Sequence, residues 1–447
     1  MSGSFYSLAA ARRSLGHFAG GKLLSAAVGI AYLLTTVRKM EPVDYGRYVA
    51  VLAMCEIFYL VTGLGLSTLA QRYVAEYRVR AVALEFRAFL GRALRRRFLY
   101  SVAFASVVYL LWSPLMRLTG LDLPEVMKLL VVALLVANAG VAYLEEVMGA
   151  LLLQGYSQAL AILRNVSKLG VLTLLLSAGA ALHVQTVISV EAAVAVLSWL
   201  TAELLVRRWA SRSPSAPGAQ AGYTSTAMNR VILRFYLVQL TGQTYGASMI
   251  KLIVTRLLGA TQTAAFGVAQ SAADILRNYM PAHMLAAWIR PLMVSRYVAN
   301  RDVGELAFMA NLVFKLNLLG LLPAAVLFAV LGDPLMAWVT GGRYLQLGSI
   351  LALLTVVVMM QTGHLLLGMI TLTLEQPGIS LRATIAAAAT LPVLVVCILG
   401  LEFTVQRPRW CWARPSGSWS PGCPSDAAIS ICASMCAALP SWSWPGR

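Results

Sequence analysis

The chain has 447 residues, of which 59% are hydrophobic and 12% charged, about half the charged share of a typical soluble domain. A soluble fold of this length has no interior large enough for so much apolar surface, so the composition excludes an ordinary soluble enzyme. The net charge of +18 does not indicate a nucleic-acid partner. The basic residues lie between apolar runs, where they act as topology signals and as contacts to anionic lipids.

Apolar runs near the ~20 residues that a spanning helix requires recur along the chain. They are continuous rather than alternating, which predicts an all-α polytopic membrane protein and not a barrel. Arg12 and Arg13 precede a long apolar stretch with no small-residue cleavage site before Arg38, so this stretch is a first spanning helix and not a signal peptide. We expect spans at roughly 16–37, 47–70, 98–116, 126–151, 162–182, 186–206, 231–256, 263–285, 309–331, 347–372 and 381–403.

The segment 71–97 sets the predicted orientation, because it contains eight arginines and only two glutamates. Such a segment beside a spanning helix marks the cytoplasmic side. Alternation then places the N-terminus and the loop with Arg164 and Lys168 in the cytoplasm as well, while most opposite loops carry few basic residues. The sequence therefore predicts a multi-pass protein of the bacterial cytoplasmic membrane with a cytoplasmic N-terminus.

Four regions follow from composition: an N-terminal helix bundle at 1–206, a Ser/Pro/Gly-rich cytoplasmic linker at 207–229, a C-terminal bundle at 230–403, and an aberrant tail at 404–447. The tail holds four of the six cysteines and five of the ten tryptophans. Disordered segments avoid both residue types, so we favour a frameshifted translation over a natural disordered tail. The cysteines predict no disulfide framework.

The two halves resemble each other. Tyr45-Gly46 precedes the tetrapeptide RYVA at 72–75, and Phe266-Gly267 precedes RYVA at 296–299. Both copies run in the same membrane direction, so we expect a parallel repeat about an axis along the membrane normal. Chance similarity is the alternative.

No catalytic motif is present. The Gly-rich run GLGLST at 63–68 lacks the third glycine of a nucleotide fingerprint and favours close helix packing. The two longest polar segments, 71–97 and 207–229, contain no acid–base cluster and no residues at metal-ligand spacing. We predict no enzyme activity, no catalytic residue, no metal and no cofactor.

Polar side chains inside the predicted spans are the candidate functional groups, because a charge at mid-bilayer costs at least ~2.5–3.5 kcal/mol and normally faces a bundle interior or an aqueous cavity. One face of the span 263–285 holds Gln270, Asp274, Arg277 and Asn278, and an arc of the span 231–256 holds Arg230, Arg234, Thr241, Thr244, Ser248, Lys251 and Thr255. These faces predict a water-accessible cavity in the second half. Buried polar packing between helices is the alternative.

The predicted substrate-binding residues are Arg277, Lys251, Arg234 and Lys315, and the predicted gating or ion-coupling residues are Glu56 and Asp274. Simpler interpretations stay open. Asp274 and Arg277 are spaced to neutralise each other at i, i+3. Lys251 and Lys315 lie near enough to the membrane surfaces to snorkel.

The sequence resembles the Wzx-like polysaccharide flippases of the multidrug/oligosaccharidyl-lipid/polysaccharide (MOP) exporter superfamily over about residues 1–403. The resemblance is carried by VRKMEPVDYGRYV at 37–49, GLGLSTLAQRYVAEY at 63–77 and RPLMVSRYVANRDVGEL at 290–306. It implies two six-helix bundles around a central cavity and alternating access. The implied substrate is an undecaprenyl-diphosphate-linked oligosaccharide, moved from the inner to the outer leaflet. Implied partners are this lipid-linked glycan, membrane lipids and glycan polymerase or other export proteins.

Two features depart from that family: the middle of the first predicted span has no basic residue, and eleven spans are expected here where the family has twelve or more. A cation-coupled drug exporter of the same superfamily is the second hypothesis, with Glu56 and Asp274 as ion-binding carboxylates. A membrane-embedded glycan polymerase or ligase is the third. Glu56 and Arg277 occupy matching repeat positions, which predicts an ion pair across the cleft in one access state.

Overall fold

The computed structural model describes residues 8–70, 74, 83–151, 153–212, 225–284, 293, 302–344, 347–374 and 377–388. The N-terminal bundle consists of α1 (Leu8–Lys39), α2 (Pro42–Val61), α3 (Leu66–Leu69), α5 (Ala83–Leu110), α6 (Trp112–Thr119), the 3-10 turn η2 (Glu125–Met127), α7 (Lys128–Ala150), α8 (Gln154–Ser177) and α9 (Val184–Arg212). The C-terminal bundle consists of α10 (Ser225–Thr244), α11 (Ala247–Leu258), α12 (Ala260–Tyr279), α13 (Pro281–Met284), α15 (Val303–Thr340), α16 (Gly348–Thr373) and α17 (Pro377–Ala388).

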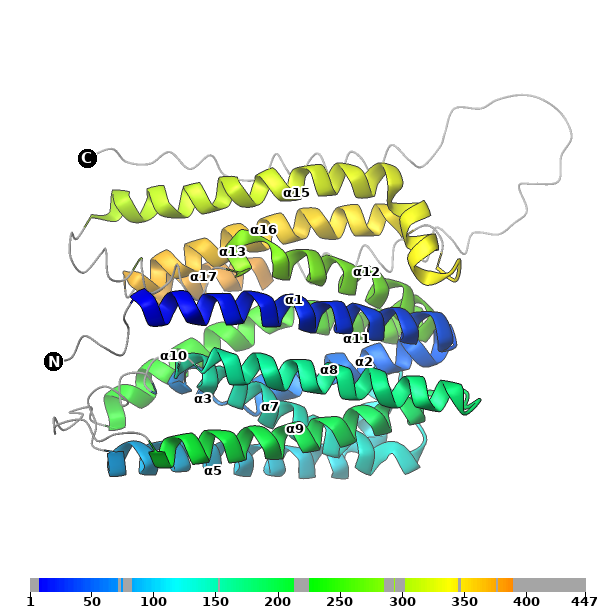
Figure 1. The fold of residues 1–447 in the computed structure, drawn as a ribbon, viewed down its shortest axis with the longest axis horizontal. Coiled ribbons are helices and arrows are strands. Elements are labelled where there is room, and N and C mark those ends of the chain that lie inside the picture. Colours follow the sequence, from blue (N-terminus) through cyan, green and yellow to red (C-terminus); the bar gives the residue numbers. More distant parts are fainter. Residues whose placement is uncertain are drawn as a thin grey trace, which may run out of the picture. The chain divides into compact units, whose positions relative to one another are not determined.

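These described elements are all helical, and Figure 1 shows the long ones running side by side, with α1 along α8 and α15 along α16. The expected all-α polytopic fold in two lobes is confirmed. Each of the eleven predicted spans overlaps a helix of the structure. Within the described residues, six helices are long and apolar enough to cross a membrane, or seven when the pair α5 and α6, bent by 79°, counts as one.

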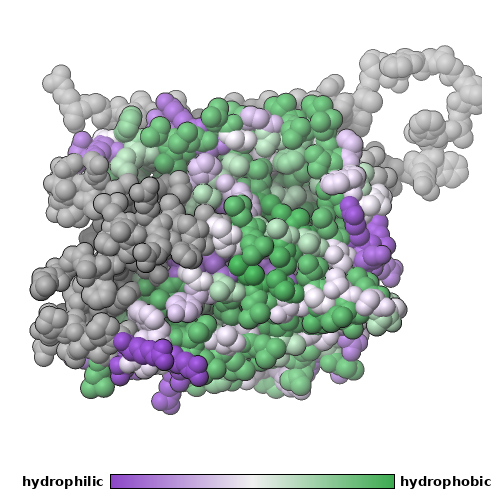
Figure 2. Space-filling model, in the orientation of Figure 1, coloured by the Kyte–Doolittle hydropathy of each residue, from purple (hydrophilic) through white to green (hydrophobic). Residues whose placement is uncertain are grey.

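The surface agrees with a membrane environment. Large apolar side chains point outward along the helices, among them Leu110, Leu118 and Leu319, which are more than two-thirds exposed. In Figure 2 hydrophobic residues cover most of the described surface, and hydrophilic ones gather mainly near the helix ends. A water-soluble monomer rarely exposes so much contiguous apolar area, so this is a multi-pass membrane protein.

The predicted helix ends were wrong where local backbone chemistry interrupts an apolar run. The predicted span 47–70 begins earlier, at Pro42, and breaks after Val61 in a turn with Leu64 (φ 42°) and Gly65 (φ 81°) in the left-handed region. Gly65 lies against α10, because a Cβ there would be 2.3 Å from Cγ2 of Ile232. The glycine therefore allows both the turn and the close approach.

The span predicted at 231–256 is two helices, since α10 ends at Thr244 and α11 begins at Ala247, with Gly246 extended between them (φ −69°, ψ 157°). The predicted arc of polar residues assumed one continuous helix, so it is divided between two axes. Residues 83–97 were predicted to be a polar cytoplasmic segment, but they form the first half of α5. Arginine has a high helix propensity, which explains why this charged segment is helical.

The helix assembly has two distinct ends. The arginine end is defined by residues 83–97 of α5 and 207–212 of α9. The far end is defined by the turns at residues 40–41, 120–124 and 341–344, where Arg47 reaches Asp122 (3.7 Å) and Arg38 reaches the end of α15. The predicted tail 404–447, the middle of the predicted linker and most of both RYVA repeats lie outside the described residues.

Candidate functional site

The two bundles meet along α2 and α12, the helices that carry the two aromatic-glycine pairs. A Cβ on Gly46 would lie 1.8 Å from the carbonyl oxygen of Ala260, and a Cβ on Gly267 would lie 2.7 Å from Cγ1 of Val49. Only a glycine lets the helices approach this closely. The internal similarity seen in the sequence thus corresponds to a direct contact between the lobes.

Arginines close the far end by capping helix C-termini of the opposite bundle. Arg38, at the end of α1, donates from Nε to the carbonyl of Val339 and from Nη2 to that of Trp338, both at 2.8 Å. In return, Arg343 after α15 donates to the carbonyl of Met40 after α1. The last carbonyls of a helix have no partner within the helix and carry partial negative charge, so arginine is well suited to both positions.

A cluster of two cations, Lys22 and Arg277, and one histidine, His283, lies on the facing sides of α1, α12 and α13. Tyr279 donates its hydroxyl to the carbonyl of Lys22 (3.2 Å), and the Lys22 ammonium is 5.8 Å from the centre of the Tyr279 ring. His283 lies within electrostatic range of both Arg277 and Lys22. Its Nε2 is buried without a hydrogen-bond partner. We call Lys22, Arg277 and His283 the inter-lobe cluster.

A helix break positions His283. Met280 is extended (ψ 143°) before Pro281, as expected for a residue that precedes proline, so α12 ends and α13 begins in a new direction. The side chain of Asn317 on α15 then fixes α13. Its Oδ1 accepts from the amide of Ala282 (2.9 Å), and its Nδ2 donates to Thr362 of α16 (3.1 Å).

Arg277 and Asp274, both singled out from the sequence, lie together. They form an ion pair at 2.9 Å, with side chains 30% and 29% exposed, and Arg277 also donates to Oε1 of Gln361 (3.3 Å). The neutralisation at i, i+3 that was the simpler interpretation is therefore formed. The partial exposure leaves the guanidinium accessible to a ligand.

Glu56 does not pair with Arg277 in this conformation and contacts α11 instead. It accepts a hydrogen bond from Ser248 of α11, so in this conformation the predicted Glu56–Arg277 pair is replaced by two separate interactions. Lys251 follows Ser248 at i, i+3 on the same face of α11 and is only 9% exposed, which argues against snorkelling. Lys315 is exposed on α15, as snorkelling requires. Of Arg234 the structure describes only its place in α10.

A buried charge cluster in the N-terminal bundle was missed by the sequence reasoning. Glu191 of α9 is 2% exposed, forms an ion pair with Lys168 of α8, and accepts hydrogen bonds from Tyr32 of α1 (2.9 Å) and Tyr48 of α2 (2.8 Å). A glutamate within a predicted span was the available signal.

Placing Lys168 and Arg164 in a loop was wrong. Both lie in α8, where Lys168 pairs with Glu191 and Arg164 with Glu145 of α7 (3.3 Å). Their charges are needed inside the bundle, because a buried carboxylate requires a cationic partner. Lys22 was also missed, since the first span was predicted to start at residue 16, whereas α1 starts at Leu8 and has Lys22 near its middle.

Comparisons with known proteins show the fold. No family model and no curated protein sequence matches the chain. Among solved structures, the MATE multidrug transporter DinF-BH is similar with a TM-score of 0.59 and 12% identity over 86% of each chain. An outward-facing MATE transporter of the MOP superfamily gives 0.54 with 15% identity, over 89% of this chain and 88% of that one. The lipid II flippase MurJ gives 0.51 with 12% identity over 87% of each chain.

Proposed function

We propose that this chain is an alternating-access transporter that flips an undecaprenyl-diphosphate-linked oligosaccharide from the inner to the outer leaflet of the bacterial cytoplasmic membrane. The inter-lobe cluster carries the proposal. Lys22 comes from one bundle and Arg277 and His283 from the other, so a ligand bound among them contacts both lobes. Arginine and lysine are the usual partners of phosphate oxygens, and a diphosphate has enough charge to engage several cations.

The arrangement also fits a transport cycle. The far end is closed by Gly46 against Ala260 and by the reciprocal arginine caps. With the N-terminus in the cytoplasm, the far end faces outward, so the substrate reaches the cluster from the inner leaflet. A ligand shifts the equilibrium between access states only by binding one state more tightly. A diphosphate that competes with Asp274 for Arg277 supplies such a difference.

Flipping is tested with the purified chain in liposomes that contain a fluorescent polyprenyl-diphosphate sugar, with loss of quenching by an impermeant reductant as the measurement. Arg277→Gln and Lys22→Gln should each lower the flipping rate about tenfold or more, because each removes a charged hydrogen-bond donor. Lys39→Gln is the matched control, since it removes one exposed lysine from the end of the same helix α1, outside the cluster. A normal rate in both cluster variants would refute the diphosphate assignment.

A cation-coupled drug exporter is the second candidate, because several of the similar structures are named MATE transporters, some of them multidrug transporters. Under this hypothesis Glu56 binds the coupling cation, and its carboxylate does accept a hydrogen bond beside the buried Lys251. Export of a lipophilic cationic dye that depends on a proton or sodium gradient, and is lost in Glu56→Gln, would favour the exporter over the flippase.

A further inference from the structure

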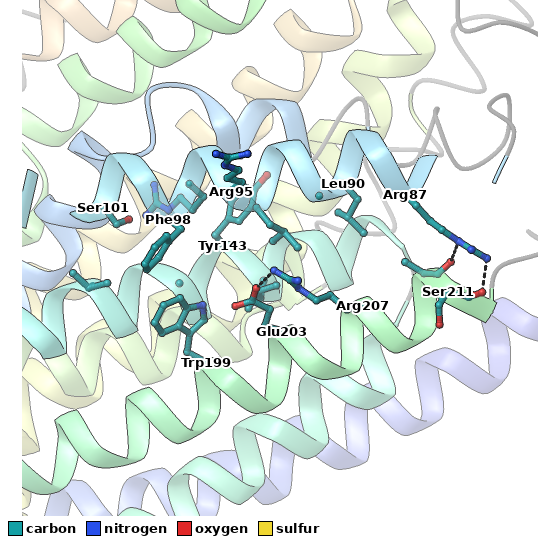
Figure 3. Close-up of a pocket in the computed structure, with 17 residues that line it drawn as sticks. Arg87, Leu90, Arg95, Phe98, Ser101, Tyr143, Trp199, Glu203, Arg207 and Ser211 are labelled. Atoms are coloured by element: carbon teal, nitrogen blue, oxygen red, sulfur yellow. Dashed lines mark hydrogen bonds and ion pairs between the residues drawn. The ribbon is translucent and has the colours of Figure 1, made fainter. Parts of the chain in front are cut away.

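A pocket of about 670 Å³ opens between α5, α7 and α9 near the arginine end, entirely within the N-terminal bundle. In Figure 3 Phe98 of α5 and Trp199 of α9 point toward each other, and Arg87 of α5 reaches Ser211 of α9. Its walls are largely apolar, and Phe98 stacks on Trp199 with ring centres 5.8 Å apart. Its volume lies in the range of ligand sites in proteins. The pocket is formed by other helices than the inter-lobe cluster.

Gly140 of α7 makes room for the Trp199 side chain, which forms one wall of the pocket. A Cβ on Gly140 of α7 would lie 2.6 Å from Nε1 of Trp199. The tryptophan therefore packs across bare backbone.

Arg97 supplies buried and unused hydrogen-bond donors at this pocket. It is 3% exposed, its Nη2 donates to the carbonyls of Tyr59 (3.1 Å) and Ala139 (3.3 Å), and its Nε and Nη1 have no acceptor. Ser101, one turn along the same face of α5, and Tyr143 of α7 also line the pocket, and their hydroxyl groups are buried without a partner. Buried polar groups are nearly always satisfied in folded proteins. Three such groups at one pocket indicate a polar ligand.

The other charges near the pocket are mostly engaged. Arg87 donates to the C-terminal carbonyls of α9 at Ala210 and Ser211, and Arg207 pairs with Glu203. These contacts are the dashed lines of Figure 3.

Arg95 is exposed on α5 and lines the pocket without any partner among the described residues. Glu146 lies within electrostatic range of Arg97. Arg95 and the Nε and Nη1 groups of Arg97 therefore remain for a ligand of small negative charge.

We propose that this pocket binds an anionic membrane phospholipid. The phosphodiester accepts hydrogen bonds from Arg97, Arg95, Ser101 and Tyr143, and an acyl chain lies against Phe98 and Trp199. The apolar walls explain why a lipid is favoured over a free anion. Basic pockets between spanning helices are suited to such headgroups. Phe98 is 46% exposed, so the pocket is reached from the lipid-facing surface of the bundle.

Native mass spectrometry of the full chain in detergent tests the proposal with three probes: phosphatidylglycerol, phosphatidylcholine and inorganic phosphate. We expect one phosphatidylglycerol per chain to be retained in preference to phosphatidylcholine. Arg95→Gln should weaken its retention about fivefold, the effect of one arginine near an anionic lipid. Arg96→Gln is the matched control, because it removes the same charge from the next residue, which is exposed and does not line the pocket.

Gly91→Leu tests the pocket by filling it. A Cβ at this helix position meets no atom within 4 Å, so the variant should fold normally and lose the bound lipid. Arg97→Gln, where it folds, should abolish the preference for phosphatidylglycerol. Equal loss in Arg96→Gln, or equal retention of phosphatidylcholine, would overturn the site. Displacement of the lipid by millimolar inorganic phosphate would show a free-anion site and overturn the lipid assignment.

Discussion

Gly46 of α2 faces the carbonyl oxygen of Ala260 so closely that a methyl group in place of its hydrogen would lie 1.8 Å from that oxygen. The contact joins the two bundles at the far end. Adding a single methyl group at Gly46 should therefore push the two lobes apart at this contact.

Gly46→Ala should weaken closure of the far end, because overpacking a tight contact costs about 1–3 kcal/mol. Spin labels on the exposed positions Leu118 of α6 and Trp338 of α15 should report a longer mean distance in the variant. Gly170→Ala is the control, since a Cβ there meets nothing within 4 Å. An unchanged distance distribution would show that α2 and α12 adjust without opening.

The reciprocal caps predict a second way to open the far end. Arg38→Gln combined with Arg343→Gln removes the donors to the C-terminal carbonyls of α15 and α1. At about 1 kcal/mol per cap, the closed-to-open ratio should fall about thirtyfold.

The same label pair measures this change, with Arg117→Gln as control. Arg117 is an exposed arginine of α6 that bonds only weakly within its own helix, to the carbonyl of Ser113 at 3.5 Å. Opening in the control to the same extent would mean that net charge, and not capping, holds the end closed.

The buried Lys168–Glu191 pair should be strongly coupled in stability. Lys168→Met leaves Glu191 buried without its cation, which typically costs about 3–5 kcal/mol. Adding Glu191→Gln to Lys168→Met should recover part of the loss, because the tyrosine hydroxyls still bond to the amide. Thermal unfolding in detergent gives the double-mutant cycle.

The partly exposed pair Glu203–Arg207 is the reference for that cycle, and its coupling should be about 0.3–0.5 kcal/mol. A similarly small coupling for Lys168 and Glu191 would show that water, rather than protein, surrounds the pair in solution.

Two further cycles separate the partners of Arg277. Asp274→Asn and Arg277→Gln should be non-additive in their effect on stability, because the two side chains form an ion pair. Glu56→Gln and Arg277→Gln should be additive, because Glu56 bonds to Ser248 in this conformation. Non-additivity of this second pair in transport, but not in stability, would assign the predicted cross-cleft pair to a different access state.

Orientation remains a prediction with a direct test. Cysteine replacing Arg92, which is exposed on α5 near the arginine end, should be protected from an impermeant thiol reagent in intact cells. Cysteine replacing Asp122, whose side chain is 98% exposed at the far end, should be labelled. The reverse pattern would invert the whole topology, since the two positions lie at opposite ends of the helices.

Hydropathy predicted which segments are helices, because bilayer thickness alone sets the length of an apolar run. It did not predict the breaks at Leu64–Gly65, Gly246 and Met280, since each depends on a local backbone conformation or a close neighbour rather than on polarity. Arg277 and Asp274 were found because their spacing is local. The partnership of Lys168 with Glu191 joins two different helices, and nothing in their spacing marks it.

The 38-residue helix α15 contacts both the far end and the inter-lobe cluster. Its final carbonyls hold Arg38 at the far end, and its Asn317 holds α13, with His283, beside Lys22 and Arg277. These points are separated by about 33 Å at 1.5 Å per helical residue. Release of Arg38 and displacement of α15 would carry the histidine away from its two basic neighbours. A bound anion would then lose the hydrogen bond that Nε2 of His283 can donate as the outer opening forms, so the motion that exposes the substrate would also weaken its binding.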